Sequence, residues 1–557
     1  MILGLDVGGT QTDAVLVCEG QVAAHVKVVN RPDLLETLSR ALDGVLSGVG
    51  VSRIRRMVFS TTMATNAVVT DRLDPAGMIV TAGPGMDPEW FSVGPAFHVV
   101  GGCLDHRGEE VVPVDEAAVK NAAAAIHKKD IDSVGIAGKF SVRNPDHELA
   151  IATMLQGSFT HLVLGHRFSG LLNFPRRIAT TYLNAALTRL HTSFLESLEQ
   201  VLRERGLNAP RYLMKPDGGT VRLAASANFP AETVQSGPAA SVMGALATDG
   251  CPGQTLVLDI GGTTTDMALV LDGMPLYVPK GITLGPFATN IRSLLTRSIG
   301  MGGDSEISTS GKRLAIGPNR QGPPMAFGGP APTPTDAMVV LGLLAEGDAA
   351  KARQAMEQVG AARRWDAKTA AREVLESMAR NLAIAAKAFV HYVNSRPVYT
   401  IYEVIEGVRL EPDGLVALGG PAAMLAPYLE QAFGLPVRVP DHFSVANAVG
   451  AAASRVTTEI SLHADTRRGV LVVPEVGLET SVRRDFTMET AMEVAKQSLA
   501  KRAAEEGATA EHLDFAISEK ESFNMIRNGA RAGRNIRLKL SLAPGLIPEW
   551  TRKEEAC

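Results

Sequence analysis

The chain contains one short segment twice, and this repeat constrains its fold more than any other feature. Residues 2–20 read ILGLDVGGTQTDAVLVCEG and residues 255–273 read TLVLDIGGTTTDMALVLDG. Aligned without gaps, 11 of the 19 positions are identical, whereas average residue usage gives roughly one identity by chance. The copies lie 253 residues apart, from Asp6 to Asp259, which is a domain-sized distance rather than a solenoid period. The sequence therefore predicts one structural unit used twice.

Each copy of the repeat predicts a hairpin that can bind an anion. An apolar strand runs into Asp-Gly-Gly-Thr and a second apolar strand follows, the pattern of a strand, a tight turn and a strand. Paired glycines permit a positive φ and let another group approach the backbone closely. The N–H groups of such a turn, together with threonine hydroxyls, form a concave site for phosphate oxygens. One such turn is commonly only structural, but two matched copies favour phosphate binding.

The aspartate at the end of each first strand suits a metal ion. Mg²⁺ prefers one or two carboxylates together with water and substrate phosphates. Asp6 and Asp259 occupy matched positions in the two copies. They are therefore the candidate metal ligands and the candidate catalytic residues.

Length and composition indicate a multidomain globular protein. At 557 residues the chain is too long for one hydrophobic core, so two to four domains are expected. Hydrophobic residues make up 45% and charged residues 20%, as in ordinary globular proteins. The formal net charge is −4, which argues against nucleic acid as a partner.

Neither the cysteines nor the apolar stretches point to a secreted or membrane protein. The four cysteines are scattered with no CxxC pair, so neither a disulfide scaffold nor a structural zinc site is expected. The start, MILGLDVGG, has no basic region typical of a signal peptide. The longest apolar stretches are broken by Gly, Asp or Pro well short of a bilayer span. We therefore expect a soluble cytoplasmic protein.

The order of apolar patterns predicts three regions. An α/β lobe with the first hairpin is expected over residues 1–175, and a second lobe with the second hairpin over 176–462. The first includes a strand leading to a Ser/Thr cluster, and a helix starting near Asn66 with Thr62 or Thr65 as its N-cap. The second begins with a long helix, Ile178–Arg205. Residues 463–557 predict a small α+β appendage with a charged helix at Thr487–Glu506 and no interpretable motif.

Further glycine-rich segments are candidates for the nucleotide site. SGPAASVMGA (Ser236–Ala245) predicts either a helix start facing an anion or a capped helix packed closely on a neighbour. In SIGMGGDS (Ser298–Ser305), Gly302 and Gly303 either approach a nucleotide or turn the chain.

Two more segments complete this set. A strand at Val416–Leu418 runs into Gly419 and Gly420 and then a helix, an arrangement that can hold a nucleoside beside the backbone. Residues Gly317–Pro334 are rich in Gly and Pro, so an irregular loop or lid is expected there.

Taken in order, these motifs resemble the hydantoinase A/5-oxoprolinase family, which includes the ATP-binding subunits of acetone carboxylases. The resemblance covers roughly residues 1–460. The segments that carry it are DVGGTQTDAVLV (6–17), STTMATNAVV (60–69), FSVRNPDHE (140–148), TTYLNAA (180–186), MKPDGG (214–219), SGPAASVMGA (236–245) and DIGGTTTDMALV (259–270). It implies two ribonuclease-H-like lobes of the actin/sugar-kinase/chaperone-ATPase superfamily flanking a nucleotide.

The chain also departs from the family pattern. Thr70 stands where the family usually has Glu, and Lys215-Pro216-Asp217 replaces Gln-Ser-Asn. GMGGDS replaces GAGGGS, which puts the carboxylate of Asp304 next to the expected nucleotide.

The resemblance implies an ATP-dependent hydrolase subunit that uses ATP and Mg²⁺. It would phosphorylate the oxygen of a cyclic amide or related carbonyl compound, a ketone included, before ring opening, together with a hydantoinase B-like partner subunit. Asp6 and Asp259 would organise Mg²⁺ and the attacking oxygen. The nucleotide-binding residues would be Gly8, Gly9, Thr10, Thr12, Gly261, Gly262, Thr263, Thr264, Asp266, Gly302, Gly303, Gly419 and Gly420. Asp13 and Asp266 could equally bond to their own turns.

Two other functions remain open on sequence alone: a small-molecule kinase that releases a phosphorylated product, and an ATP-driven reactivase or chaperone acting on a partner protein. No catalytic triad can be assembled from the histidines and cysteines. The histidines of the first lobe, His98, His106, His147 and His166, are expected to be structural more often than substrate contacts.

Overall fold

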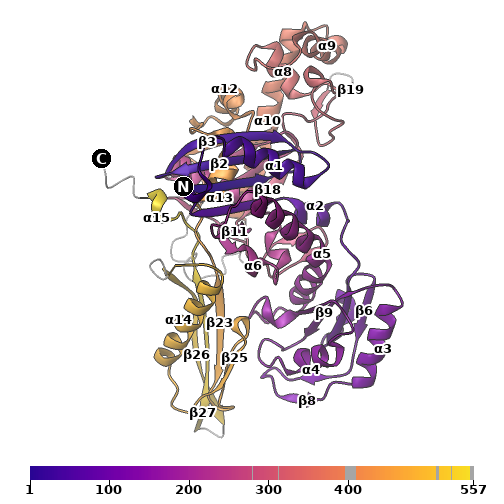
Figure 1. Cartoon of the computed structure of the whole chain (residues 1–557), viewed down its shortest axis with the longest axis vertical. Coiled ribbons are helices and arrows are strands. Elements are labelled where there is room, and N and C mark those ends of the chain that lie inside the picture. The colour runs from indigo at the N-terminus through magenta and orange to yellow at the C-terminus, as the bar shows by residue number, and fades with distance from the viewer. Residues whose placement is uncertain (279, 311–312, 396–408, 510–513, 528–529, 552–557) are drawn as a thin grey trace.

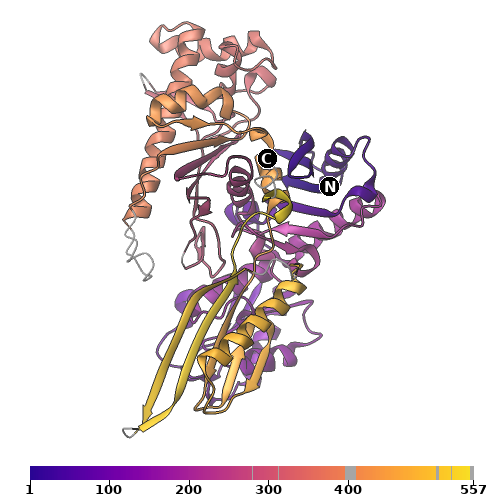
Figure 2. The same cartoon turned by 90° about the vertical axis from the view of Figure 1, so that its left-hand side faces the viewer.

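The two copies of the repeat form the centres of two six-stranded sheets. The computed structural model of the protein describes residues 1–278, 280–310, 313–395, 409–509, 514–527 and 530–551. The lobe built on the first copy and the lobe built on the second lie side by side at one end of the molecule (Figures 1 and 2). Two smaller α/β units lie at the other end.

The first sheet has the strand order β12-β11-β4-β1-β2-β3. Strand β1 pairs antiparallel with β2 and parallel with β4. The strands are β1 (Ile2–Val7), β2 (Gln11–Cys18), β3 (Gln21–Val29), β4 (Arg56–Thr61), β11 (Arg211–Met214) and β12 (Thr220–Arg222).

The second sheet repeats this topology. Strand β13 pairs antiparallel with β14 and parallel with β21, so β13, β14 and β21 correspond to β1, β2 and β4. The order is β15-β14-β13-β21-β22, and β18 also pairs with β14. The strands are β13 (Gln254–Ile260), β14 (Thr265–Leu271), β15 (Met274–Pro275), β18 (Thr296–Ile299), β21 (Gly414–Leu418) and β22 (Val437–Arg438). The predicted fold class, two duplicated α/β lobes, is confirmed.

Both sheets are covered on both faces, which explains why their central strands are almost continuously apolar. Leu3 and Leu5 of β1 pack beneath α1 (Leu34–Val45) and α5 (Phe174–Glu204). The opposite face of the first sheet packs on α13 (Ala446–Ala453).

The second sheet is also covered by helices on both faces. One face packs on α8 (Pro334–Val340), α9 (Ala349–Gly360), α10 (Ala367–Asn394) and α12 (Ala422–Phe433). Its other face packs on α7 (Ser236–Asp249). Helices α7 and α13 therefore lie back to back between the two sheets.

Glycines set how closely these two central helices approach. A Cβ on Gly450 of α13 would lie 2.0 Å from the carbonyl oxygen of Ala240 and 2.4 Å from the nitrogen of Gly244 in α7. A Cβ on Gly244 would lie 2.2 Å from the oxygen of Ala446. In the same way, Gly4 of β1 leaves room for the oxygen of Ala448, 2.2 Å from its Cβ position. Side chains at these positions would push the two lobes apart.

The first of the smaller units is a four-stranded parallel sheet in the order β10-β9-β5-β6. Its strands are β5 (Gly77–Thr81), β6 (Ala96–Val99), β9 (Ser133–Gly138) and β10 (His161–Leu164). The second is an antiparallel sheet in the order β25-β24-β23-β27-β26 that packs on α14 (Met488–Glu505). Its strands are β23 (Glu459–Asp465), β24 (Val470–Val473), β25 (Leu478–Ser481), β26 (Phe515–Arg527) and β27 (Ala530–Leu542).

The second unit is the predicted C-terminal appendage, and its charged helix lies where it was predicted. The domain boundaries at 175 and 462 stay a prediction; the first six-stranded sheet takes strands from both sides of residue 175. The long helix predicted at Ile178–Arg205 is confirmed as α5, although it begins one turn earlier at Phe174 behind an Asn173 cap. The helix expected near Asn66 begins at Met63, and Thr62 occupies its N-cap position.

No helix within the described residues is long and apolar enough to cross a membrane. Cys18, Cys103 and Cys251 are free thiols. Cys557 lies outside the described residues.

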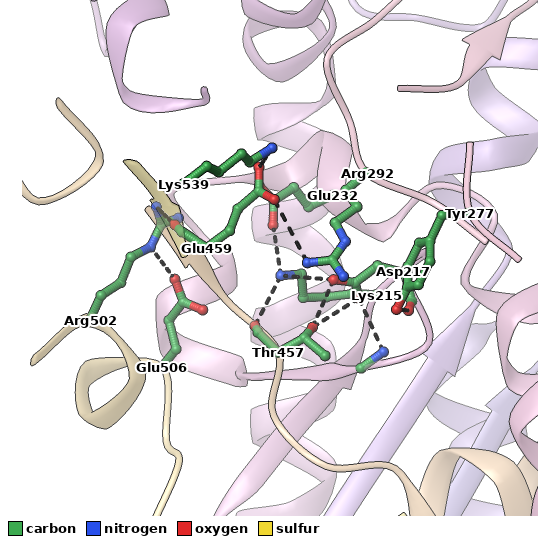
Figure 3. Close-up of polar contacts among 11 residues, drawn as sticks. Lys215, Asp217, Glu232, Tyr277, Arg292, Thr457, Glu459, Arg502, Glu506 and Lys539 are labelled. Atoms are coloured by element: carbon green, nitrogen blue, oxygen red, sulfur yellow. Dashed lines mark hydrogen bonds and ion pairs between the residues drawn. The ribbon is translucent and has the colours of Figure 1, made fainter. Parts of the chain in front are cut away.

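A buried cluster of charges joins the C-terminal unit to both lobes (Figure 3). Lys215, just after β11, donates to the carbonyl oxygen of Thr457 at 3.2 Å and lies 3.4 Å from Glu232 and 3.8 Å from Asp217. The Thr457 hydroxyl donates to Asp217 at 2.8 Å. We call this group and its neighbours the junction cluster; the further members are Tyr277, Arg292, Glu459, Arg502, Glu506 and Lys539.

The junction cluster surrounds a cavity of about 30 Å³, which is room for roughly two water molecules. Burial alone raises the pKa of Asp217, but Lys215 and Arg292 hold it below its ordinary value. Burial alone lowers the pKa of Lys215, but Asp217 and Glu232 raise it above its ordinary value. The ionised forms therefore stabilise one another inside the protein. Lys215 and Asp217 are two of the positions at which the chain departs from the family pattern.

We expect Gly450→Ala to destabilise the chain by about 1–3 kcal/mol, because the new methyl group would overlap the backbone of α7. The sign is informative, since Gly→Ala in an unhindered helix interior stabilises by about 1 kcal/mol. The free energy of unfolding from urea titration measures the change. Gly50→Ala is the matched control, because its Cβ would meet only Ser52 Oγ at 3.9 Å and φ is −68°. An unchanged or increased stability for Gly450→Ala would contradict the close helix contact.

We expect Lys215→Met to cost about 3–5 kcal/mol of unfolding free energy at pH 8, because it leaves Asp217 and Glu232 as buried carboxylates without their cation. Burial already raises the pKa of Glu232 above its ordinary value. Without the ammonium group that pKa rises further, and the pKa of Asp217 also rises because burial is then less opposed. The loss is then complete at high pH and shrinks as the pH falls toward 5 and the carboxyls take up protons. Urea unfolding at pH 8 and pH 5 measures both effects, and Lys351→Met, on the exposed face of α9, is the control. An equal loss of unfolding free energy at pH 8 and pH 5 would show that Lys215 does not stabilise the protein through its charge.

Candidate functional site

The turns of the two hairpins have the same geometry. The N–H of Gly8 donates to the carbonyl oxygen of Gln11 at 3.0 Å, and the N–H of Gly261 donates to that of Thr264 at 2.9 Å. None of Gly8, Gly9, Gly261 and Gly262 has a positive φ. The expected use of glycine for a left-handed turn is therefore wrong.

Close approach, the other expected use of glycine, is confirmed at two of these positions. A Cβ on Gly8 would lie 2.8 Å from the oxygen of Gln11, and a Cβ on Gly262 would lie 2.7 Å from Asp304 Oδ2. Glycine at these two positions thus leaves room for the carbonyl oxygen of Gln11 in the first turn and for the carboxylate of Asp304 at the second.

Asp6 lies at the carboxyl end of β1, next to Ser60 of β4 in the sheet register. Its side chain is buried. Asn447, at the start of α13, donates from Nδ2 to Asp6 Oδ2 at 3.3 Å, and Oδ1 is buried with no hydrogen-bond partner. One oxygen of this carboxylate therefore accepts a hydrogen bond, and the other is available to a ligand.

Asp259 occupies the equivalent place in β13. Ser241 of α7 donates its hydroxyl to Asp259 Oδ2 at 2.6 Å. The other oxygen, Oδ1, lies 2.7 Å from the position of a Cβ on Gly419. As at Asp6, one of the central helices holds one carboxylate oxygen.

Asp6 and Asp259 lie near enough for their charges to interact. Burial raises the pKa of Asp6, hydrogen bonds from Ser60 and Asn447 oppose the shift, and the negative charge of Asp259 adds to it. The charges of Asp6 and Asp259 also raise the pKa of Asp13, which burial brings to about 6 against the effect of Lys27. Burial and the charge of Asp259 raise the pKa of Asp266 to about 7. Such shifts are typical of buried carboxylates that lie near one another.

Asp13 and Asp266 sit directly across their hairpins from Asp6 and Asp259. Lys27 of β3 donates to Asp13 Oδ2 at 2.8 Å, so Asp13 is already paired. Asp266 is only partly buried and, of the two, is the one without a cation within ion-pair distance in the described part of the chain.

The four threonines are not equivalent. Thr10 and Thr264 are exposed and Thr263 is half-buried, so these three can reach a ligand. Thr12 is fully buried, and its hydroxyl donates to Asn30 Oδ1 at 2.8 Å. The side chain of Asn30 in turn donates to the carbonyl oxygen of Gly8 at 2.8 Å. In this structure, Thr12 supports the turn from behind.

The third glycine cluster rests on the second hairpin. The N–H of Gly303 donates to the carbonyl oxygen of Gly261 at 2.9 Å, and the N–H of Asp304 donates to that of Gly262 at 2.7 Å. A Cβ on Gly302 would lie 2.6 Å from both of these oxygens. The cluster and the second turn are thus one continuous backbone surface.

Gly419 and Gly420 follow β21 on the same side of the second lobe. Gly419 has a φ of +88°, and its Cβ would lie 2.2 Å from the carbonyl oxygen of Ile260. Gly420 is exposed, and a Cβ there would meet no atom within 4 Å. An open backbone surface beside Asp259 is what a bound nucleoside would need.

The start of α7 contacts the Ser/Thr cluster after β4. The hydroxyl of Ser236 donates to the carbonyl oxygen of Thr61 at 2.8 Å, and the hydroxyl of Thr65 accepts from the N–H of Gln235 at 2.7 Å. Of the two predictions for this helix, close packing on a neighbour is confirmed by its contact with α13. Its facing an anion stays a prediction.

The donor set fits Mg²⁺. Asp6 Oδ1 is a buried oxygen that lacks a partner, and Asp259 is close enough for its charge to act on Asp6. Two carboxylates completed by water and phosphate oxygens are the usual magnesium site. Among the described residues there is no group of three or more His, Cys, Asp and Glu side chains that could hold a metal by themselves. The phosphates would therefore have to supply ligands.

Sequence reasoning missed three side chains at this site: Ser241, Asn447 and Arg320. Asn447 is the one polar residue of α13, which was a usable signal, whereas Ser241 is one of several polar residues of α7. Arg320 lies in the Gly/Pro-rich loop, where nothing in the sequence marks it.

The histidines of the first lobe lie in the four-stranded unit. His166 Nδ1 lies 2.7 Å from the buried Glu148, and His147 Nε2 lies 3.0 Å from Glu110. Both pairs hold loops of that unit together, in line with a structural role. The junction cavity is lined by residues such as Lys215, Glu232 and Arg502, so it is separate from the two hairpin turns.

Two sequence profiles of one family match the chain. The profile described as hydantoinase/oxoprolinase N-terminal region matches residues 2–159, and the one described as hydantoinase/oxoprolinase matches residues 177–460. Each of the two profiles contains one copy of the hairpin.

Curated relatives show the same similarity. The caprolactamase subunit alpha of Pseudomonas jessenii is 25% identical over 387 residues, covering 62% of this chain and 55% of that protein. The acetophenone carboxylase gamma subunit of Aromatoleum aromaticum is 26% identical over 393 residues, covering 61% and 53%. The 5-oxoprolinase of Saccharomyces cerevisiae is 26% identical over 414 residues, covering 61% and 32%. The chain spans about half the length of the first two.

Solved structures agree on the fold. A nucleotide-free acetone carboxylase structure superposes with a TM-score of 0.72 at 18% identity, over 98% of this chain and 88% of that one. The ATP-dependent caprolactamase of Pseudomonas jessenii superposes with a TM-score of 0.70 at 19% identity, over 97% and 87%. The similarity therefore extends through the C-terminal unit.

The second profile alone covers just over half of the 557 residues, and the hairpins, the glycine clusters and the fold agree with it. The chain belongs to the hydantoinase/oxoprolinase family.

Proposed function

We propose that this chain is an ATP-dependent hydrolase subunit that transfers the γ-phosphoryl group of ATP to the oxygen of a cyclic amide or related carbonyl compound. A hydantoinase B-like partner subunit would complete the hydrolysis and ring opening. The relatives support the substrate class and the partner, since one is a caprolactamase alpha subunit and another a 5-oxoprolinase.

One observation carries the proposal: Asp6 and Asp259 occupy matched places in the two lobes, and their charges interact. They end equivalent strands of two equivalent lobes, and the charge of Asp259 raises the pKa of Asp6. Had Asp6 and Asp259 lain in unrelated pockets, there would be no basis for proposing an ATPase. Two glycine turns, in which Gly9 and Gly262 are exposed, follow these aspartates, which suits a polyphosphate held from both sides.

The residues of the turns would position the phosphates. Phosphoryl transfer needs little covalent chemistry from the protein, so positioning and charge neutralisation dominate. Gly8, Gly9 and Thr10 would hold one side, and the set Gly261, Gly262, Thr263 and Thr264 the other. Thr12 would act through Asn30 and the carbonyl of Gly8. Gly302 and Gly303 would extend the second side, and Gly419 and Gly420 would contact the nucleoside.

Asp6 and Asp259 would hold Mg²⁺. When bound, this ion would supply positive charge that neutralises the phosphates and lowers the raised pKa values of the carboxylates around it. Asn447 and Ser241 each fix one oxygen of these carboxylates, so the remaining oxygens point to a defined place. Asp266, directly across the second hairpin from Asp259, would lie beside this ion.

The chemistry requires the amide oxygen to be activated. A bond would form between that oxygen and the γ-phosphorus, the bond from the γ-phosphorus to the bridging oxygen would break, and ADP would leave. Water can then add to the activated amide carbon, the ring C–N bond breaks as the nitrogen takes up a proton, and a second water hydrolyses the resulting acyl phosphate to a carboxylate and phosphate. Without phosphorylation, the oxygen of an amide is a poor leaving group.

We expect Asp6→Asn and Asp259→Asn each to lower the kcat of ATP hydrolysis about 100-fold or more. Both substitutions keep the side-chain shape but remove a charge needed for the cation and the transferring phosphoryl group. Steady-state ADP release measures the effect. Asp485→Asn, on an exposed side chain of the C-terminal unit, is the control and should match the wild type. Activity within threefold of wild type for both site variants would exclude the assigned role.

The proposed function itself is tested by substrate-dependent ADP release from the full chain with Mg²⁺, using five-membered lactams, hydantoins and ketones, with and without a B-type subunit. We expect one of these classes to stimulate ADP release, ring opening only with the partner present, and loss of activity in EDTA. A stable phosphoester would favour a small-molecule kinase instead. Stimulation by a partner protein alone would favour a reactivase.

A further inference from the structure

Arg320 connects the two hairpins across the site. Its Nη1 donates to the hydroxyl of Thr10 in the first turn at 3.3 Å. Its Nη2 donates to Oδ2 of Asp304, beside the second turn, at 3.2 Å. The two contacts reach residues that are about 300 positions apart in the chain and belong to different lobes.

The loop that carries Arg320 is anchored to the second lobe. The N–H of Gly317 donates to the carbonyl oxygen of Glu306 at 2.9 Å, and the N–H of Glu306 donates to that of Asn319 at 2.8 Å. The side chain of Gln321 donates to Glu306 Oε1 at 2.7 Å. Arg320 is therefore flanked on both sides by fixed residues, and its position beside the turns is set by the fold.

Asp304 holds the guanidinium at the second turn. Its Oδ1 accepts from the hydroxyl of Thr335 at 3.3 Å, and its backbone N–H is bonded to Gly262. Only a glycine at position 262 leaves room for this carboxylate, because a Cβ there would lie 2.7 Å from Oδ2. Asp304 is therefore fixed beside the second turn, where its carboxylate accepts from the guanidinium of Arg320.

The charge balance of the site calls for a cation at this place. Lys27 and Arg320 both contact the hairpins, and Lys27 is paired with Asp13. A polyphosphate adds several negative charges to those of Asp6 and Asp259. Arg320 has donors to spare, since its Nε is buried with no hydrogen-bond partner. The planar guanidinium suits phosphate oxygens because it presents several N–H groups in a fixed fork.

We propose that Arg320 binds the polyphosphate of the nucleotide between the two hairpins, and that Asp304 holds its guanidinium there until the nucleotide arrives. This inference rests on the proposed ATP-dependent function. Arg320 is then a substrate-contacting residue and Asp304 a positioning residue. When the nucleotide binds, its phosphates replace Asp304 as the partner of the arginine.

The test is calorimetric titration of the full chain with Mg²⁺ and AMP-PNP, ADP or adenosine, using wild type, R320Q and R320K. We expect R320Q to weaken AMP-PNP and ADP binding about 10- to 100-fold, as for the loss of a hydrogen-bonded charge. R320K should be intermediate, because lysine keeps the charge but not the fork. Adenosine binding should change less than twofold. The control is R353Q, on the exposed face of α9, with wild-type affinities expected for all three ligands.

A second variant tests the role of Asp304. We expect D304N to tighten AMP-PNP binding severalfold, because the substitution frees Arg320 from its ion pair. The gain should be smaller in an R320Q background, where there is no arginine to free. Weaker binding of D304N with Mg²⁺ but not in EDTA would instead make Asp304 a metal ligand and overturn its assignment. An R320Q affinity for AMP-PNP within twofold of wild type would overturn the role of Arg320 and leave the ATPase proposal standing. Wild-type protein that binds no nucleotide would overturn both.

Discussion

The contact between α7 and α13 is the interaction on which the rest of the structure depends. Gly244 and Gly450 let the two helices touch backbone to backbone, and each helix covers the inner face of one sheet. The same helices carry Ser241 and Asn447, which hold Asp259 and Asp6. The spacing of the lobes and the placement of the two carboxylates thus have a single cause. A larger residue at the crossing would change both together.

Four aspartates, Asp6, Asp13, Asp259 and Asp266, lie close together around the two hairpins. Burial raises the pKa values of Asp6, Asp13 and Asp266, and Asp259 adds to each shift. Such crowding costs stability in the free protein, but it prepares a place for a divalent cation, whose charge reverses these shifts. Arg320 would add to the effect of the cation, since the phosphates need a second source of positive charge.

A different electrostatic solution joins the C-terminal unit to the lobes. In the junction cluster, Lys215 and Arg502 neutralise Asp217, Glu232 and Glu506 inside the protein. Ionised groups in such an arrangement depend on one another, because removing one partner leaves the other buried without compensation. Of the positions that depart from the family pattern, Lys215 and Asp217 lie in this junction and Asp304 lies beside the second turn, whereas Thr70 caps the end of the helix that begins at Met63.

The sequence by itself determined the duplicated hairpins, the α/β class and most of the site, because these depend on local patterns: strand, Asp-Gly-Gly-Thr, strand. It predicted Asp6 and Asp259 as partners since a repeated unit has repeated geometry. It could not decide that Thr12 faces Asn30 rather than the site, or that the glycines serve close approach rather than a positive φ. Only the tertiary structure brought Ser241, Asn447 and Arg320 to the carboxylates and turns. Those contacts join segments from 18 to 441 residues apart, and no local pattern records which distant segments will meet.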